Sequence, residues 1–96
     1  MIVGVCRIEL VLPAISSLKQ KRSCLKSLNA QIHKKFHVAS AEVDLHDVWQ
    51  SSTLGVAAVS TSASHAESVL ENVVYWIEDN RPDVEVVDYY IETTRY

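Results

Sequence analysis

The feature that most limits the fold of this chain is the order in which two hydrophobic periodicities follow one another. Alternating apolar and polar residues, typical of strands, occupy four segments, and apolar residues at helical spacing occupy two. We assign strands to residues 2–12, 38–48, 53–61 and 84–94, and helices to residues 64–79 and to a segment that Ser17 opens and whose apolar stripe runs to Phe36. The predicted order is therefore strand-helix-strand-strand-helix-strand.

This order predicts one domain, residues 1–96, of the α+β class. Two right-handed βαβ units joined in this way give a ferredoxin-like βαββαβ sandwich, a four-stranded antiparallel sheet with two helices on one face. A length of 96 residues with 48% hydrophobic content suits a single core and excludes disorder. No apolar run is long enough for a transmembrane helix.

Local signals define the ends of the helices. Ser17 with Gln20, and Ser64 with Glu67, each match a capping box, in which side chains bond the free backbone N–H groups of the first turn. Pro82 is expected to stop the second helix, because proline cannot continue one. The residues expected to be buried are Leu18, Leu25, Leu28, Ile32 and Phe36 on the first helix, and Ala66, Val69, Leu70, Val73 and Ile77 on the second.

The charges are distributed unevenly. The net charge is −3, but residues 13–40 contain six Lys and Arg and no acid, so this segment carries +6 and the rest −9. Cations on one helix attract phosphates, and a capped helix start also favours anions. The candidate anion- or RNA-binding residues are Ser17, Lys19, Lys21, Arg22, Lys26 and Lys34. Two alternatives are a solvated basic face and pairing with the acidic second helix.

The second face of the predicted sheet is also apolar. Val3 and Val5 point away from the helices, and an exposed apolar face on a small domain is typical of a partner surface. We therefore expect a homo-oligomer that associates through this face. Trp49, in a polar loop, either packs on the edge of the core or anchors an interface. The interface prediction comprises Val3, Val5 and Trp49.

The sequence offers little for catalysis. Glu42, Asp44 and His46 alternate on one predicted strand and could hold a metal, but a polar solvent face gives the same pattern, and we predict no metal and no cofactor. Cys6 and Cys24 make no disulfide framework, and Cys24 is expected to be inert although nearby lysines could lower its pKa. No nucleophile or acid–base set can be assembled, so we expect no enzyme. With reduced thiols and no basic leader, a cytoplasmic location is expected.

Several sequence blocks are similar to those of a known bacterial family. They are residues 3–10 (VGVCRIEL), 17–22 (SLKQKR), 41–44 (AEVD), 47–50 (DVWQ) and 54–57 (LGVA). Over nearly the whole chain they resemble the YlxP-like family of small uncharacterised proteins. The resemblance implies a ferredoxin-like fold. The genes of this family are often found among those for translation initiation and ribosome maturation, which implies a role with RNA or ribosomes.

The resemblance places Ser17, Lys19, Lys21 and Arg22 in the family's basic block. Lys21 lies close to the apolar stripe, so we expect its stem to be partly buried or its ammonium to pair with Glu42 or Asp44. His46 stands where the family often has another polar residue, so no metal role is transferred to it.

The leading hypothesis is a non-enzymatic accessory module that binds the phosphate backbone of RNA or of a ribosomal assembly through the basic helix. The alternatives are an oligomeric module that binds a small anion or metabolite, and a structural subunit that binds a protein partner. No membrane partner is expected.

Overall fold

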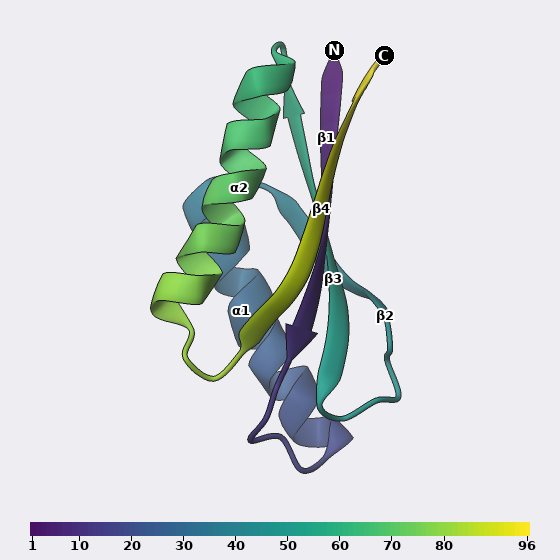
Figure 1. Ribbon diagram of the computed structural model, residues 1–96, viewed down its shortest axis with the longest axis vertical. Helices are drawn as coiled ribbons and strands as arrows, with labels where there is room; N and C mark the ends of the chain where they lie inside the picture. The colour runs from purple at the N-terminus through teal and green to yellow at the C-terminus, as the bar shows by residue number, and fades with distance from the viewer.

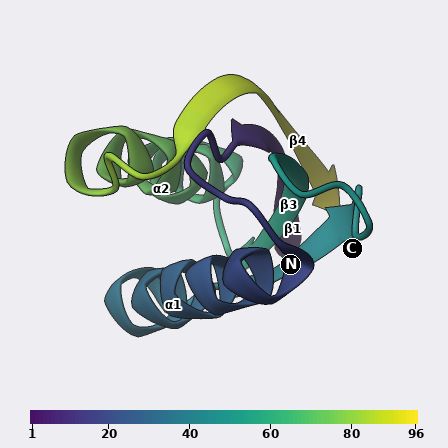
Figure 2. The same cartoon turned by 90° about the horizontal axis from the view of Figure 1, so that it is seen from below.

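The computed structural model describes residues 1–96 and contains the six predicted elements in the predicted order. Their bounds are β1 (Ile2–Val11), α1 (Leu18–Phe36), β2 (Ala39–Asp44), β3 (Ser51–Ser60), α2 (Ala63–Asn80) and β4 (Glu85–Arg95). The strands form one antiparallel sheet in the order β2-β3-β1-β4, and both helices cover the same face of it (Figures 1 and 2). The predicted ferredoxin-like α+β sandwich is confirmed.

The hydrophobic core fills the space between the sheet and the helices. Every second side chain of β1 is buried there, because successive side chains of a strand point to opposite faces. The fully buried members of the core are Ile8, Leu12, Leu28, Ile32, Leu54, Leu70, Val73, Val74 and Ile77. Neither helix is long and apolar enough to cross a membrane.

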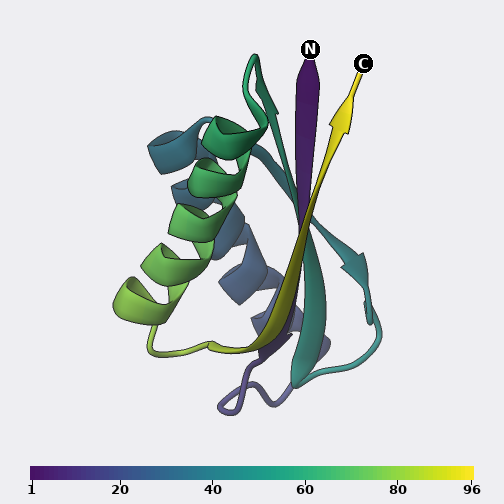
Figure 3. The same cartoon turned by 45° about the horizontal axis from the view of Figure 1, so that its top comes forward.

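The other side of the sheet carries no helix (Figure 3). We call it the open sheet face, and β1 contributes Val3, Val5, Arg7 and Glu9 to it, because these alternate with the buried positions. Two edge strands, β2 and β4, bound this face. The prediction that Val3 and Val5 point away from the helices is therefore confirmed.

The two helix starts differ in how well the capping signals predict them. Ser17 caps α1, and its Oγ accepts a hydrogen bond from the N–H of Gln20 at 3.1 Å. Gln20 Oε1 accepts from the N–H of Ser16 at 2.9 Å, so the return bond lies one residue earlier than a standard capping box. The Ser64–Glu67 prediction is wrong: Ser62 is the N-cap of α2, and its Oγ accepts from His65.

Strand β2 is shorter than the predicted strand over residues 38–48. It ends at Asp44, because Leu45 adopts a left-handed backbone with φ 63°, which breaks the extended conformation. The pairing of β2 with β3 also shifts between Glu42 and Asp44, a bulge that places one extra residue on β2. Residues 45–50 therefore form a loop between β2 and β3.

Gly4 allows α2 to lie close to β1. A Cβ on Gly4 would lie 3.0 Å from Leu70 Cδ1 and 3.1 Å from Ala66 Cβ, and both of these side chains are fully buried. We expect Gly4→Ala to lower the free energy of unfolding by about 1–2 kcal/mol, because a packed core cannot absorb the extra atom without strain. Chemical denaturation of the two proteins measures this difference.

Gly55→Ala is the matched control. Its Cβ would meet Val43 Cγ1 at 2.8 Å and Cγ2 at 3.5 Å, but Val43 is 50% exposed near the end of an edge strand, and the strand can move outward there. We expect a smaller loss of unfolding free energy than for Gly4→Ala, below about 1 kcal/mol. A Gly55→Ala variant destabilised as strongly as Gly4→Ala would contradict the packing argument.

Candidate nucleic-acid interface

The outer side of α1 carries most of the predicted anion-binding residues. We call Lys19, Arg22, Lys26 and Lys34 the basic face, and all four are exposed. At 100° per residue they span an arc of about 120° opposite the buried stripe of the helix, and Lys19 lies about 22 Å from Lys34 along the axis. The helix therefore presents a row of cations to solvent, with three of them within its first turns and Lys34 in its last turn.

No acidic side chain neutralises the basic face. The salt bridges of the structure join Arg7 to Asp44, Lys21 to Glu42 and Arg81 to Asp83, and none involves Lys19, Arg22, Lys26 or Lys34. Pairing with the acidic second helix, one of the alternatives, is thus not found within the chain. Lys34 also lies in the last turn of α1, where a cation is favourable near the negative end of the helix dipole.

Ser17 lies at the start of this helix as predicted. Its Oγ accepts the bond from Gln20, which leaves the hydroxyl proton as a donor. The first turn of α1 contains no acidic residue, so the positive end of the helix dipole is uncompensated. An anion near the helix start would meet Ser17 and Lys19.

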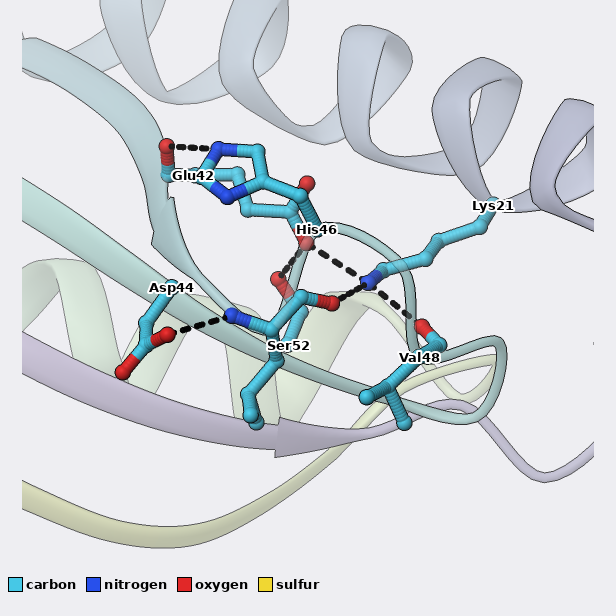
Figure 4. A network of polar contacts seen from close by, with 7 residues as sticks. Lys21, Glu42, Asp44, His46, Val48 and Ser52 are labelled. Carbon is cyan, nitrogen blue, oxygen red and sulfur yellow. Dashed lines mark hydrogen bonds and ion pairs between the residues drawn. The ribbon is translucent and has the colours of Figure 1, made fainter.

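Lys21 is not part of this exposed surface. Its side chain is 1% exposed, and its Nζ lies 2.7 Å from Glu42 Oε2 on β2 (Figure 4). The same ammonium donates to the carbonyl oxygens of Leu45 and Val48, both at 2.6 Å. The expectation that Lys21 pairs with a carboxylate such as Glu42 is confirmed.

The three contacts use all three protons of the Lys21 ammonium. Glu42 Oε2 also accepts a hydrogen bond from Ser52 Oγ at 2.7 Å, so the carboxylate has a second partner. Lys21 therefore has no donor left for an outside phosphate. Of the predicted set, Ser17, Lys19, Arg22, Lys26 and Lys34 remain available to a ligand.

The predicted row of Glu42, Asp44 and His46 is not formed. Glu42 keeps the side of β2 that faces α1, and the bulge after it turns Asp44 to the open sheet face, where Asp44 bonds Arg7 at 3.4 Å. His46 lies in the loop, where its Nε2 is 3.2 Å from the carbonyl oxygen of Glu42 (Figure 4). The expectation of a shared strand face is wrong, because it assumed unbroken alternation through residue 46.

A second polar cluster links α1 to the end of α2. Arg81 donates to Asp83 at 2.7 and 2.9 Å and to Gln31 of α1 at 2.8 Å. Cys24 donates its thiol proton to Asp83 Oδ2 at 3.4 Å. Burial, followed by this hydrogen bond, raises the pKa of Cys24, opposite to the lowering that nearby lysines could cause. Burial also raises the pKa of Cys6 to about 11, so neither thiol is a thiolate at neutral pH.

The predicted interface residues lie in two places. Val5 is 44% exposed and Val3 is half-buried, both on the open sheet face. Trp49 lies in the β2–β3 loop and is 52% exposed, and it does not belong to the side chains that pack on the core. Of its two interpretations, packing on the edge of the core is therefore not found.

The open sheet face also contains a hollow that the sequence reasoning missed. The hollow has a volume of about 610 Å³, and the small residues Ala39, Ala41, Gly55 and Ala57 contribute to its lining. The sequence does show that small residues alternate along β2 and β3. This alternation indicates a hollow only once the register of the sheet is known, because the register brings the two strands side by side.

The buried pair gives a stability prediction. Lys21→Met leaves the Glu42 carboxylate and two carbonyl groups without their cation. We expect the free energy of unfolding to fall by about 3 kcal/mol, the lower end for breaking a buried pair, because Glu42 retains 15% exposure. The same substitution at exposed Lys26 is the control, with an expected change within about 0.5 kcal/mol. Equal losses in urea denaturation would contradict the buried role of Lys21.

Asp83 gives a prediction for acid pH. Its hydrogen bond with Arg81 lowers the pKa of the carboxyl from 3.8 to about 2. Because the folded pKa is the lower one, this ionised group stabilises the fold above pH 4, and the contribution disappears as the pH falls through about 2. We expect Asp83→Asn to flatten the pH dependence of stability over this window. Denaturation at closely spaced acid pH values measures it, and an unchanged profile would exclude the assignment.

Comparison with known proteins identifies the family of this chain. A family model described as "Protein of unknown function (DUF503)" matches residues 3–91. The "Uncharacterized protein YlxP" of Bacillus subtilis (strain 168) is 35% identical over 83 residues, which cover 86% of this chain and 89% of that protein. This level of identity over most of both chains supports the resemblance seen in the sequence blocks. The chain therefore belongs to the DUF503 family of YlxP-like proteins.

Proposed function

We propose that this protein is a non-enzymatic cytoplasmic accessory module that binds the phosphate backbone of RNA, or of an RNA-containing assembly such as the ribosome, through α1. The contacts are made by the basic face, Lys19, Arg22, Lys26 and Lys34, with Ser17 at the helix start. The observation that carries the proposal is the row of exposed cations without intramolecular salt bridges on a helix that has no acid. Such a row neutralises phosphates and releases their counterions.

The separation of charge within the chain supports this role. The protein carries a net charge of −3, so its acidic surfaces repel RNA while the basic face attracts it. RNA is then expected to approach α1 in preference to the rest of the molecule. Attraction from one helix against a net negative background weakens rapidly as salt screens it.

Sequence-specific base recognition is not expected. RNA-recognition sheets stack bases on aromatic side chains of their central strands, and β1 and β3 contain no aromatic residue. Contacts to phosphate position a protein on a nucleic acid without reading its sequence. The genes of translation and ribosome maturation that often accompany this family make structured RNA the first ligand to test.

The test is the salt dependence of RNA binding. With four phosphate contacts we expect the logarithm of the binding constant to fall with the logarithm of salt at a slope of about −3. Lys19→Ala/Arg22→Ala/Lys26→Ala removes three of these contacts and should flatten the slope to about −1. Fluorescence anisotropy with a labelled structured RNA at several salt concentrations gives both slopes.

A variant with the same change in net charge is the control. Arg7→Ala/Lys35→Ala/Arg95→Ala removes three cations outside the basic face and should keep most of the slope. Equal loss of binding in both variants would indicate a general charge effect and exclude α1 as the site. Absence of binding by the unmodified protein at low salt would overturn the RNA proposal.

The small-anion alternative gives a different result. A rise in melting temperature with inorganic phosphate, together with no affinity for RNA, would favour an anion site at the start of α1, because a ligand stabilises the state that binds it. A stabilisation that disappears in Lys19→Ala and persists in Lys34→Ala would place this site next to Ser17.

A further inference from the structure

On the open sheet face the register of the strands places small side chains over one half of the sheet and large side chains over the other half. One row across the sheet consists of Ala41 on β2, Gly55 on β3, Arg7 on β1 and Tyr90 on β4. The next row consists of Ala39, Ala57, Val5 and Glu92 in the same strand order. In both rows the side chains are small on β2 and β3 and large on β1 and β4. The face is therefore low over one half and high over the other.

The hollow of about 610 Å³ lies over the low half and is bordered by Val5, Arg7 and Tyr90 of the high half, which ends in this aromatic ring. Tyr90 is 62% exposed although its strand lies against the core, and Val43 and Val5 at the border of the hollow are 50% and 44% exposed. Apolar groups this exposed around a hollow are typical of an interface.

We propose that this face binds the same face of a second copy of the chain in a two-fold symmetric dimer, with Tyr90 of each copy entering the hollow of the other. A two-fold axis in the interface, parallel to the strands, reverses the strand order. It places β4 of one copy opposite β2 of the other and β1 opposite β3. The high half of each face then lies over the low half of its partner, as an isologous contact requires.

The register makes the placement specific. Because such an axis preserves the position along the strands, Tyr90 of one copy lies opposite Ala41 of the other, and Arg7 lies opposite Gly55. The small residues leave room for both of these large side chains. Two sheets that pack face to face keep their strands nearly aligned, about 30° apart, which agrees with this axis.

The area is sufficient for a weak dimer. Strands about 4.8 Å apart that rise about 3.3 Å per residue give a face of about 600 Å² per copy, or about 1,200 Å² in total, the lower end of standard interfaces. Apolar side chains in the middle of the face supply the favourable contact. We therefore expect association at micromolar rather than nanomolar concentrations.

The charges of the face predict how salt affects the dimer. Glu9 lies opposite Asp88 at one end of the face, Asp44 lies in the same row on β2, and Arg7 is the single cation beside this row. Two copies bring these carboxylates together, so they repel, and salt screens the repulsion. The dimer should tighten as salt rises, whereas RNA binding through α1 weakens. The dimer proposal does not depend on the RNA proposal.

The first test is sedimentation equilibrium of the full chain over concentrations up to about 300 µM, chosen for an interface of this size. We expect masses that rise from 10.8 kDa toward twice this value. Tyr90→Ala and Ala41→Lys should each weaken association about tenfold or more, since one removes the inserted ring and the other fills the hollow with a charge. Tyr75→Ala, which removes an exposed tyrosine from α2, is the matched control and should leave association unchanged.

A monomer at all concentrations would overturn the proposal. A dimer weakened no more by Tyr90→Ala and Ala41→Lys than by Tyr75→Ala would also overturn it, because the copies would then meet elsewhere. Circular dichroism of each variant establishes that it is folded.

Covalent cross-linking tests the orientation directly and leaves Tyr90 in place. The same two-fold places Glu92 of one copy opposite Ala39 of the other, whereas within one chain these residues lie on opposite edge strands, about 14 Å apart. Because packed sheets lie about 10 Å apart, a short bismaleimide should join Glu92→Cys/Ala39→Cys into a covalent dimer, visible on a denaturing gel. Tyr75→Cys/Ala39→Cys is the control and should remain monomeric. Equal cross-linking in both variants would exclude the proposed two-fold.

Discussion

The buried ion pair of Lys21 and Glu42 is the contact through which α1, β2 and the β2–β3 loop are joined. In place of water, the Lys21 ammonium contacts one carboxylate oxygen and two backbone carbonyl oxygens, and each of the three contacts is 2.7 Å or shorter. A buried charge without such partners would be costly. The loop therefore follows a path that keeps its carbonyl groups on Lys21, and β2 ends where this path begins.

The cations of α1 therefore have two different environments. Lys21 is buried in the ion pair and stabilises the fold, whereas the four cations of the basic face remain in solvent without salt-bridge partners. The Lys21–Glu42 bond holds α1 on the sheet edge near β2, so the basic face points away from the sheet. The proposed RNA surface and the proposed dimer surface thus lie on opposite sides of the molecule. A dimer would present two basic helices outward, and two linked sites raise the apparent affinity for a long RNA.

The sequence predicted what depends on local periodicity. Both helices, all four strands and the Ser17 cap could be read from spacing, since core burial imposes a period of 2 on strands and 3.6 on helices. The cap of α2 was predicted two residues late, because Ser62 and Ser64 are both suitable caps and the end of β3 selects between them. The angle of Lys21 beside the apolar stripe predicted a buried stem or a carboxylate partner, Glu42 or Asp44, and the structure shows that the partner is Glu42.

The sequence by itself determined the order of elements, the apolar stripes and the concentration of positive charge on one helix, because each follows from residues close together in the chain. Only the tertiary structure decided which cation is buried, where β2 ends and how the open sheet face is shaped. The bulge after Glu42 separates Glu42 from Asp44, and the register brings Ala41, Gly55, Arg7 and Tyr90 into one row. These contacts join residues far apart in the chain, and their geometry depends on packing that no local pattern encodes.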